Sequence, residues 1–268
     1  MKFQVDHDYH IHTQISPCSS DPEQNPETIL QFGIAHNMKH IVLTDHFWDE
    51  TIPGTTFWPG YEKISQWLPL PQSPDLQMHL GCEAEMDMAA TVGISRKTAE
   101  KFDFITVPTN HLHLIGSTIT RENASDVKAL TRLYIDRWKV LLDADLPFHK
   151  MGIAHLDTLC LHGFEDQSST RLAIMESITD NVYKDLFGRM VKLGMGVELN
   201  VLVSEYTEEQ LDRALRIYRI AAECGCRFYC GTDAHHPSDM EPAYQNCCLV
   251  VDKLRLDEEQ KFNPFQKL

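Results

Sequence analysis

The chain alternates between short apolar runs and longer segments with helical periodicity. Apolar runs rich in β-branched and aromatic residues predict strands. Strands that alternate regularly with helices predict a parallel sheet with right-handed crossovers. Seven such runs occur: FQVDHDYHI from residue 3, HIVLTDH from 40, MHLGCEAEMD from 78, DFITVPTNH from 103, MGIAHLD from 151, MGVELNV from 195 and RFYCGTDAH from 227.

The segments between these runs carry the residues that begin and end helices. Pro26 suits a first helical turn, Thr207 begins a capping box, and Gly194 and Gly225 stand where helices commonly end. We find no internal repeat and no low-complexity linker, so we expect one α/β domain over residues 1–268. The predicted helices cover residues 26–37, 122–144, 181–194 and 207–225.

Residues 48–75 interrupt the alternation with a stretch rich in proline and aromatic residues. A segment of this length without sustained periodicity is usually functional or disordered. Its three tryptophans, Trp48, Trp58 and Trp67, favour a packed structure. We therefore predict an insertion that covers either the active site as a lid or the flank of the fold.

The composition narrows the class of protein. The 268 residues are 43% hydrophobic and 24% charged, which is enough apolar material for a sizeable core. No apolar run approaches the roughly 20 residues of a membrane span, and the N-terminal residues lack the apolar stretch of a signal peptide. We expect a cytoplasmic protein without a membrane partner. The net charge of -15 argues against nucleic acid as the main partner, and the oligomeric state stays open.

The eight cysteines lack the spacing of a disulfide framework, so we expect mostly reduced thiols. Cys224, Cys226 and Cys230 form a cluster that could bind a metal ion. They flank an apolar strand, however, and burial explains them more simply.

The sequence DYHIHT at residues 8–13 begins the candidate chemistry. Residues two apart in a strand point to the same face, so His10 and His12 would lie side by side and could hold one metal ion. The C-terminal ends of the strands in a parallel barrel share one rim, where active sites assemble. Metal-ligand residue types recur at most of the predicted strand ends: His10, His12, Asp45, His46, Glu83, His111, His155, Asp233 and His235.

Six motifs resemble, in order, those of the PHP (polymerase and histidinol phosphatase) family of metal-dependent phosphoesterases. They are DYHIHT, TDH at 44–46, GCE at 81–83, DFITVPTNH ending at 111, GIAHLD around 155 and GTDAHHP at 231–237. They span most of the chain and look most like the histidinol-phosphatase branch. The resemblance implies a distorted (β/α)7 barrel that holds up to three divalent metal ions, zinc, manganese or iron(II), at its C-terminal rim.

The same resemblance implies a set of ligands. It gives one metal ion to His10, His12, Glu83 and Asp233, with Glu83 bridging to a second ion. The second ion would be held by His111 and His155, and the third by His46 and His235. The family pattern has a histidine where this chain has Cys18, which would favour zinc or iron over manganese. Asp21 is the alternative to Cys18, and a small buried thiol without a metal is the other interpretation.

Geometry leaves some neighbouring residues open. Glu85 shares the strand parity of Glu83, and His113 could replace His111, although the family spacing favours Glu83 and His111. His7 should face away from His10 if the strand is regular. The sixth predicted strand, GVELN at 196–200, lines the pocket in this family without supplying a principal ligand.

The implied reaction is hydrolysis of a small phosphomonoester, such as L-histidinol phosphate, by a metal-activated hydroxide. Asp45 is expected to orient an imidazole or to move a proton, and His235 is the other candidate for protonating the leaving group. Arg121, in the loop after the fourth strand, could bind the phosphate, or it could be an exposed arginine at a helix start.

Two other functions remain open. An amidohydrolase also uses HxH on its first strand and a late aspartate, but its barrel has eight strands. TDH on the second strand and DAH on the seventh suit the phosphoesterase better. A non-catalytic metal-binding module is the third interpretation, although a degenerate module should have lost ligands.

Overall fold

The computed structural model describes residues 1–55 and 57–266. Seven strand positions follow one another around a parallel sheet, in the order β1, β2, β4, β5, β7, β9 and β10, and β3 extends the sheet beside β4. The strands of this sheet are β1 (His7–Ile11), β2 (His40–Leu43), β3 (His46–Phe47), β4 (Gln77–Ala84), β5 (Phe104–Val107), β7 (Met151–Ile153), β9 (Gly196–Glu198) and β10 (Phe228–Tyr229).

The first and last strands meet and nearly close the sheet into a barrel. The backbone N–H of Tyr9 donates to Cys230 O at 2.9 Å, that of Asp233 donates to His10 O at 2.6 Å, and Ile11 pairs with Ala234 in a parallel bridge. Backbone pairing therefore joins the start of the chain to a segment more than 200 residues later. The predicted distorted (β/α)7 barrel is confirmed.

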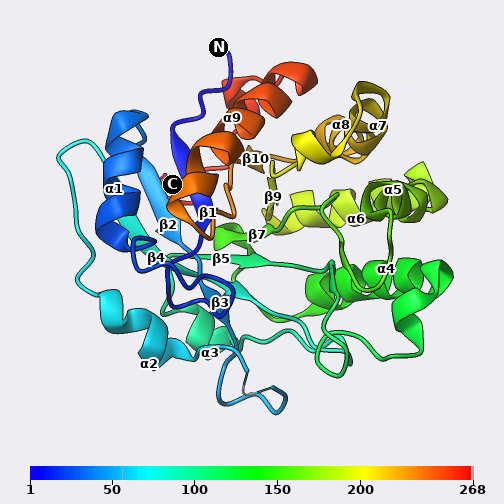
Figure 1. Ribbon diagram of the computed structural model, residues 1–268. Coiled ribbons are helices and arrows are strands. Elements are labelled where there is room, and N and C mark those ends of the chain that lie inside the picture. Colours follow the sequence, from blue (N-terminus) through cyan, green and yellow to red (C-terminus); the bar gives the residue numbers. More distant parts are fainter. Residues whose placement is uncertain (56, 267–268) are drawn as a thin grey trace.

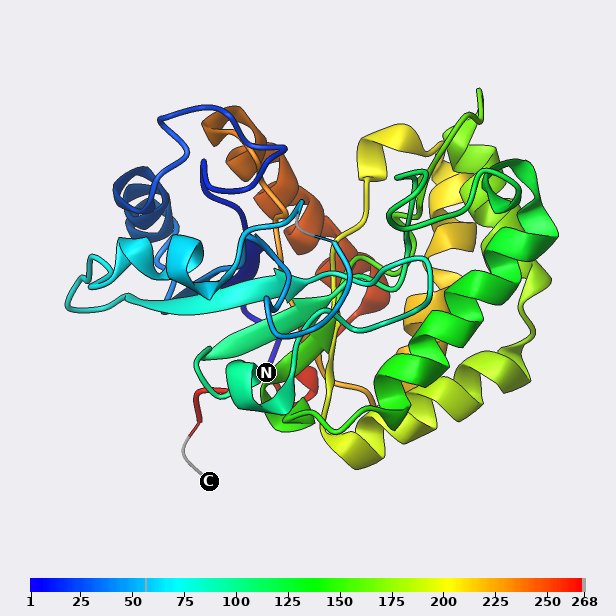
Figure 2. The same ribbon diagram turned by 90° about the horizontal axis from the view of Figure 1, so that it is seen from below.

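The helices surround this barrel unevenly. Figure 1 shows α4 to α8 gathered on one side of the strands and α1 on the other, and Figure 2 shows the same arrangement from below. None of the helices in the described ranges has the length and apolar run that a membrane crossing requires. The helices are α1 (Pro26–Ala35), α2 (Tyr61–Ile64), α3 (Arg96–Ala99), α4 (Val127–Asp143), α5 (Gln167–Ser177), α6 (Asp180–Leu193), α7 (Glu208–Ala214), α8 (Arg216–Glu223) and α9 (Pro237–Leu254).

The helix predictions hold in position and differ at the ends. The helix expected over 207–225 is split into α7 and α8 at Leu215, and Thr207 forms the predicted capping box with Gln210. Gly194 ends α6 in the left-handed conformation. Helices α5 and α9 lie outside the four predicted helical segments.

The lower part of the barrel interior is filled with aromatic side chains. Tyr9, Phe104 and Tyr229 are buried there, with ring centroids 5.2 to 5.9 Å apart. Gly152 leaves room for them, because a Cβ at this position would lie 2.3 Å from the Tyr229 ring. The register between β1 and β2 shifts between Asp8 and Ile11. Strand β1 is thus not regular, and such a bulge changes the direction of side chains near a site.

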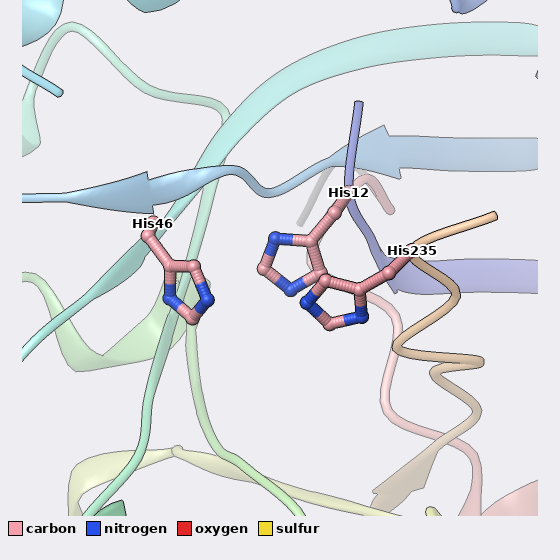
Figure 3. A group of neighbouring side chains, drawn as sticks. All are labelled: His12, His46 and His235. Atoms are coloured by element: carbon pink, nitrogen blue, oxygen red, sulfur yellow. The ribbon is translucent and has the colours of Figure 1, made fainter. Parts of the chain in front are cut away.

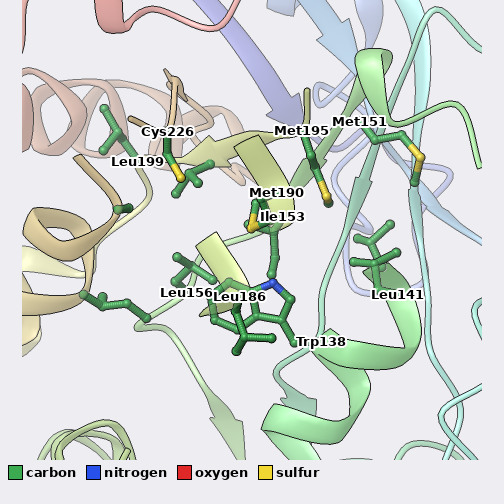
Figure 4. Close-up of a cluster of buried hydrophobic side chains, with 14 of the residues drawn as sticks. Trp138, Leu141, Met151, Ile153, Leu156, Leu186, Met190, Met195, Leu199 and Cys226 are labelled. Atoms are coloured by element: carbon green, nitrogen blue, oxygen red, sulfur yellow. The ribbon is translucent and has the colours of Figure 1, made fainter. Parts of the chain in front are cut away.

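A second apolar layer lies between the strands and the α4–α6 side. Figure 4 shows Trp138 and Leu141 of α4 with Leu186 and Met190 of α6 and Ile153 of β7. All five are buried. This layer supports β7 and β9 from outside the barrel.

Of the cysteines suspected of binding metal, Cys226 and Cys230 are buried in the main hydrophobic core, and Cys224 packs against it. All eight cysteines of the chain are free thiols. Burial therefore accounts for this cluster.

Trp138→Ala should lower the free energy of unfolding by about 3–5 kcal/mol, because it removes the largest fully buried side chain and leaves a cavity. Urea unfolding followed by far-UV circular dichroism measures the change. Val140→Ala is the matched control on the same helix, where the side chain is 42% exposed, and it should change stability by less than about 0.5 kcal/mol. Equal losses in the two variants would contradict the packing described here.

Candidate metal centre

Four side chains from three strands converge at the upper end of the barrel. His12 Nε2 lies 2.9 Å from Asp233 Oδ1 and 3.2 Å from His10 Nε2. His10 Nε2 is 3.4 Å from Asp233 Oδ1, and both imidazoles are 3.6 Å from a Glu83 carboxylate oxygen. A tetrahedral site with bonds of about 2.1 Å has ligand atoms about 3.4 Å apart. This group has the dimensions of a single ion site.

Glu83 also faces a second pair of histidines. Its Oε1 lies 3.3 Å from His155 Nε2 and 3.7 Å from His111 Nε2. Burial would raise the pKa of Glu83, but the neighbouring His46, His10 and His111 imidazoles hold it well below its ordinary value. The carboxylate is therefore ionised and lies between two groups of imidazoles, as a bridging ligand would.

A third group contains His12, His46 and His235, whose rings Figure 3 shows facing one another. The His12 and His235 rings stack at 4.1 Å. Cys18 Sγ lies 3.1 Å from His46 Nε2. Although burial raises the pKa of Cys18, its contacts with His235 and His46 lower it to about 7, which favours a thiolate.

Two buried polar atoms of this cluster lack a hydrogen-bond partner, as expected of atoms that would bind metal ions. His46 Nδ1 and Glu83 Oε2 lie 2.7 Å apart, yet neither makes a hydrogen bond of acceptable geometry, although both are buried. Buried polar atoms are rarely left without a partner. Burial lowers the pKa of His46 and His111, but the nearby carboxylates raise it well above the ordinary value. In the absence of metal these imidazoles hold protons, which bound ions would displace.

Three further side chains contact the Nδ1 atoms of three imidazoles. His10 Nδ1 lies 2.9 Å from Glu198 Oε1, His12 Nδ1 lies 2.8 Å from Ser16 Oγ, and His111 Nδ1 lies 3.0 Å from Glu85 Oε1. Such contacts leave Nε2 of each ring free to face a metal ion.

Glu85 and Glu198 are the two functional candidates that the sequence did not assign. Glu85 Oε1 is 2.7 Å from His46 Nδ1 as well as touching His111, so one carboxylate contacts imidazoles of two groups. Glu198 also accepts a hydrogen bond from the His155 backbone N–H at 2.7 Å. The parity of Glu85 with Glu83, and the position of Glu198 within the predicted strand that lines the pocket in this family, were the available signals.

Asp45 lies below the cluster and is completely buried. Its carboxylate accepts hydrogen bonds from the Thr13 N–H and hydroxyl and from the Ser16 hydroxyl. It therefore reaches His12 through Ser16. This geometry favours the orienting role over proton transfer to a substrate.

Two ligand candidates have a backbone conformation that is uncommon for residues other than glycine. Asp233 has φ 53° and His155 has φ 21°. Strain of this kind is maintained where surrounding structure holds it, and it clusters at functional sites. The tight turns after β10 and β7 thus aim these two side chains into the barrel.

His111 does not lie on the fourth strand of the main sheet, where its motif placed it. β5 ends at Val107, and His111 lies on β6 (His111–Leu112), which pairs with β8 (Cys160–Leu161) outside the main sheet. Buried Arg137 supports this ribbon by donating to His111 O at 2.9 Å. His113 lies beside the cluster, with its ring 5.6 Å from that of His111.

Other predicted residues lie outside the cluster. His7 Nε2 accepts a hydrogen bond from the Cys230 N–H and faces away from His10. Asp21 lies 3.9 Å from His236 Nδ1 rather than beside His46, so Cys18 is the better-placed candidate of the two. Arg121 is exposed in a turn and is not one of the described residues that line the pocket above the cluster.

That pocket has a volume of about 280 Å³ and opens above Cys18, His46, His111, Asp233 and His235. The 48–75 segment borders it through Phe57 and Trp58, and the Trp58 ring lies 4.6 Å from the His46 ring. Trp67 Nε1 donates to Thr13 Oγ1 at 3.1 Å, and Trp48 is buried. Residue 56 of this segment lies outside the described residues. The segment thus forms part of the pocket wall, and its closure as a lid stays a prediction.

Comparisons with known proteins give a likeness in structure but none in sequence. No protein-family model and no curated protein matches the sequence. The structure matches that of histidinol phosphate phosphatase (HISK) from Lactococcus lactis subsp. lactis Il1403, complexed with zinc, L-histidinol and phosphate, with a TM-score of 0.63. The match covers 97% of this chain and 99% of that chain at 14% identity. It shows that the two chains share a fold over nearly their full lengths.

Glu83→Ala should reduce metal occupancy at two sites, because its carboxylate faces two groups of imidazoles. His235→Ala should mainly empty the group that contains His12 and His46. Elemental analysis after equilibration with buffered zinc measures the ions per chain, and circular dichroism checks that each variant is folded. A larger loss in His235→Ala than in Glu83→Ala would contradict the bridging position.

Glu85→Gln should weaken metal binding about 10–100-fold, because the amide keeps the size of the side chain but removes the charge that orients two imidazoles. Competition with a chromophoric chelator measures the affinity. Glu62→Gln, at an exposed position in the 48–75 segment, is the control and should bind like the unaltered protein. Unchanged affinity in Glu85→Gln would show that the carboxylate is dispensable.

Proposed function

We propose that this chain is a metal-dependent phosphoesterase of the PHP type that hydrolyses small phosphomonoesters. The observation that supports this best is the convergence of ligand side chains from separate strand ends into overlapping groups around Glu83. They are His10, His12, Cys18, His46, Glu83, His111, His155, Asp233 and His235. The shared fold with a histidinol phosphate phosphatase supports the same conclusion.

We assign the metal ions to zinc, manganese or iron(II), two or three per chain. When bound, such ions activate water and neutralise the charge of a phosphate. The chain itself supplies their positions: carboxylates and imidazoles from separate strands are fixed by the barrel and by Glu85, Glu198 and Ser16 behind them. Cys18, as a thiolate, would favour zinc or iron at the third site.

The remaining task of the protein is to hold the substrate and protonate the leaving alcohol. Of the two candidates for the proton, His235 lines the pocket, and Asp45 is buried with three hydrogen bonds below it. We therefore assign the orienting of His12 to Asp45. His235 is also a proposed ligand, so it could protonate the leaving group only in a form that does not hold the third ion. Arg121 remains a candidate for phosphate binding only if its loop approaches the pocket.

L-histidinol phosphate is the reference compound for comparing phosphomonoesters, because the matched phosphatase structure is complexed with L-histidinol and phosphate. The amidohydrolase alternative is less well supported, since the sheet has seven positions around the barrel rather than eight. A non-catalytic role is also less well supported, because the predicted ligands are retained and a pocket opens directly above them.

Purified protein should contain two or three divalent ions per chain, and their removal by a chelator should lower the melting temperature and abolish phosphatase activity. The loss of stability follows from the charge that the ions neutralise among buried carboxylates, and the loss of activity follows from the loss of water activation. Elemental analysis, thermal unfolding and release of phosphate from a panel of phosphomonoesters measure them. The panel should contain L-histidinol phosphate, nucleoside monophosphates and sugar phosphates, each tested with manganese, zinc and iron(II).

The panel also separates the alternatives. Turnover of amides or lactones while every phosphoester is inert would favour the amidohydrolase. Metal-loaded protein that is inert toward all of these compounds would favour the non-catalytic module. Protein that binds no metal would remove the basis of the proposal.

A further inference from the structure

The pocket above the candidate metal centre has a polar floor and mainly apolar walls. The floor consists of the ligand candidates, and these can hold a phosphate through their metal ions. The walls are formed mainly by apolar and aromatic side chains. The residues that make them are Pro17, Phe57, Trp58, His113, Leu114 and Cys160.

Phe57 and Trp58 form the most distinctive part of the wall. Their rings meet edge to face, with centroids 4.6 Å apart and an interplanar angle of 75°. Trp58 is 9% exposed, whereas Phe57 is 58% exposed at the mouth of the pocket. An aromatic ring exposed beside a pocket gains free energy when an apolar group covers it.

The walls offer no counter-charge for a cationic group. Among the described residues that line the pocket, Asp233 is the one carboxylate, and Cys18, the proposed thiolate, belongs with it to the metal centre. Asp233 Oδ1 already lies 2.9 Å from His12 Nε2 within the metal centre. A cationic leaving group would therefore lose water without gaining an ion pair, and metal ions on the floor would repel it.

We propose that this site selects phosphomonoesters whose leaving alcohol is small, uncharged and apolar or aromatic. Phe57 and Trp58 are the specificity-determining residues. The inference rests on the proposed phosphoesterase activity and names its substrate class. The volume of about 280 Å³ lies near the lower end of ligand pockets, which suits a short branched chain or a single ring.

L-histidinol phosphate differs from neutral phosphomonoesters in the charge of its leaving alcohol. That compound fits the proposed reaction, but its leaving alcohol carries a protonated amine for which the walls hold no free carboxylate. It should therefore be a poorer substrate than a neutral ester of similar size.

A matched pair of esters tests the charge alone. 3,3-Dimethylbutyl phosphate and phosphocholine have the same shape and differ by a carbon in place of the quaternary nitrogen. The neutral ester should have a kcat/KM at least tenfold higher, which corresponds to about 1.4 kcal/mol in transition-state binding. Equal values, or a preference for phosphocholine through attraction to the aromatic rings, would overturn the inference.

Substitutions in the 48–75 segment test whether Phe57 determines the selectivity. Phe57→Ala should reduce the advantage of the neutral ester about fivefold, because the apolar surface at the mouth is removed. Leu68→Ala is the control in the same segment, since Leu68 is 48% exposed and does not line the pocket. It should leave the ratio of the two kcat/KM values unchanged. An unchanged ratio in Phe57→Ala would remove Phe57 as a determinant and overturn its assignment.

The corresponding phosphonates, which are not hydrolysed, give a readout of binding alone. Calorimetry on the metal-loaded protein should show tighter binding of 3,3-dimethylbutylphosphonate than of its trimethylammonium analogue by tenfold or more. If no phosphoester turns over, the proposed function fails, and these affinities decide the selectivity independently. Equal affinities would overturn the inference, even in a protein that hydrolyses phosphoesters.

Discussion

The structure depends on a buried carboxylate, Glu83, at the centre of the barrel rim. It is completely buried, and five imidazoles from four different segments surround it. An ionised carboxylate is costly to remove from water unless positive charge compensates it. Protonated imidazoles can provide this charge, and bound divalent ions would provide it more completely. This requirement explains why so many ionisable groups gather here and why the Nδ1 atoms of His10, His12 and His111 have defined partners.

The barrel below the site keeps this arrangement rigid. Tyr9, Phe104 and Tyr229 are almost fully buried and pack together in the barrel interior. Gly231, just before Asp233, allows the close approach of Glu198, since a Cβ there would lie 1.9 Å from Glu198 Oε1. The packed aromatic side chains and the close contact at Gly231 thus support the polar rim from beneath. Access remains from above, where the pocket lies.

Three separate loop segments form the upper side of the site. Cys18 comes from the loop after β1, Trp58 from the 48–75 segment, and Leu114 from the loop after β6. The barrel fixes the metal-binding side chains, while these loops form the walls that a substrate would meet. Under the proposed function, the reaction and the choice of leaving group would therefore depend on different parts of the chain, as is common for barrels of this type.

The sequence by itself predicted the barrel and supplied most of the ligand candidates, because alternation of strands and helices is local and strand ends share one rim. His10 and His12 were paired by strand parity, whereas Glu83 was preferred to Glu85 because GCE resembles a motif of the PHP family. Only the tertiary structure showed that Glu85 touches two imidazoles, that Asp45 acts through Ser16 and that Arg121 lies away from the pocket. These facts depend on contacts between residues far apart in sequence, on a bulge in β1 and on the separate ribbon that carries His111, none of which follows from a local pattern.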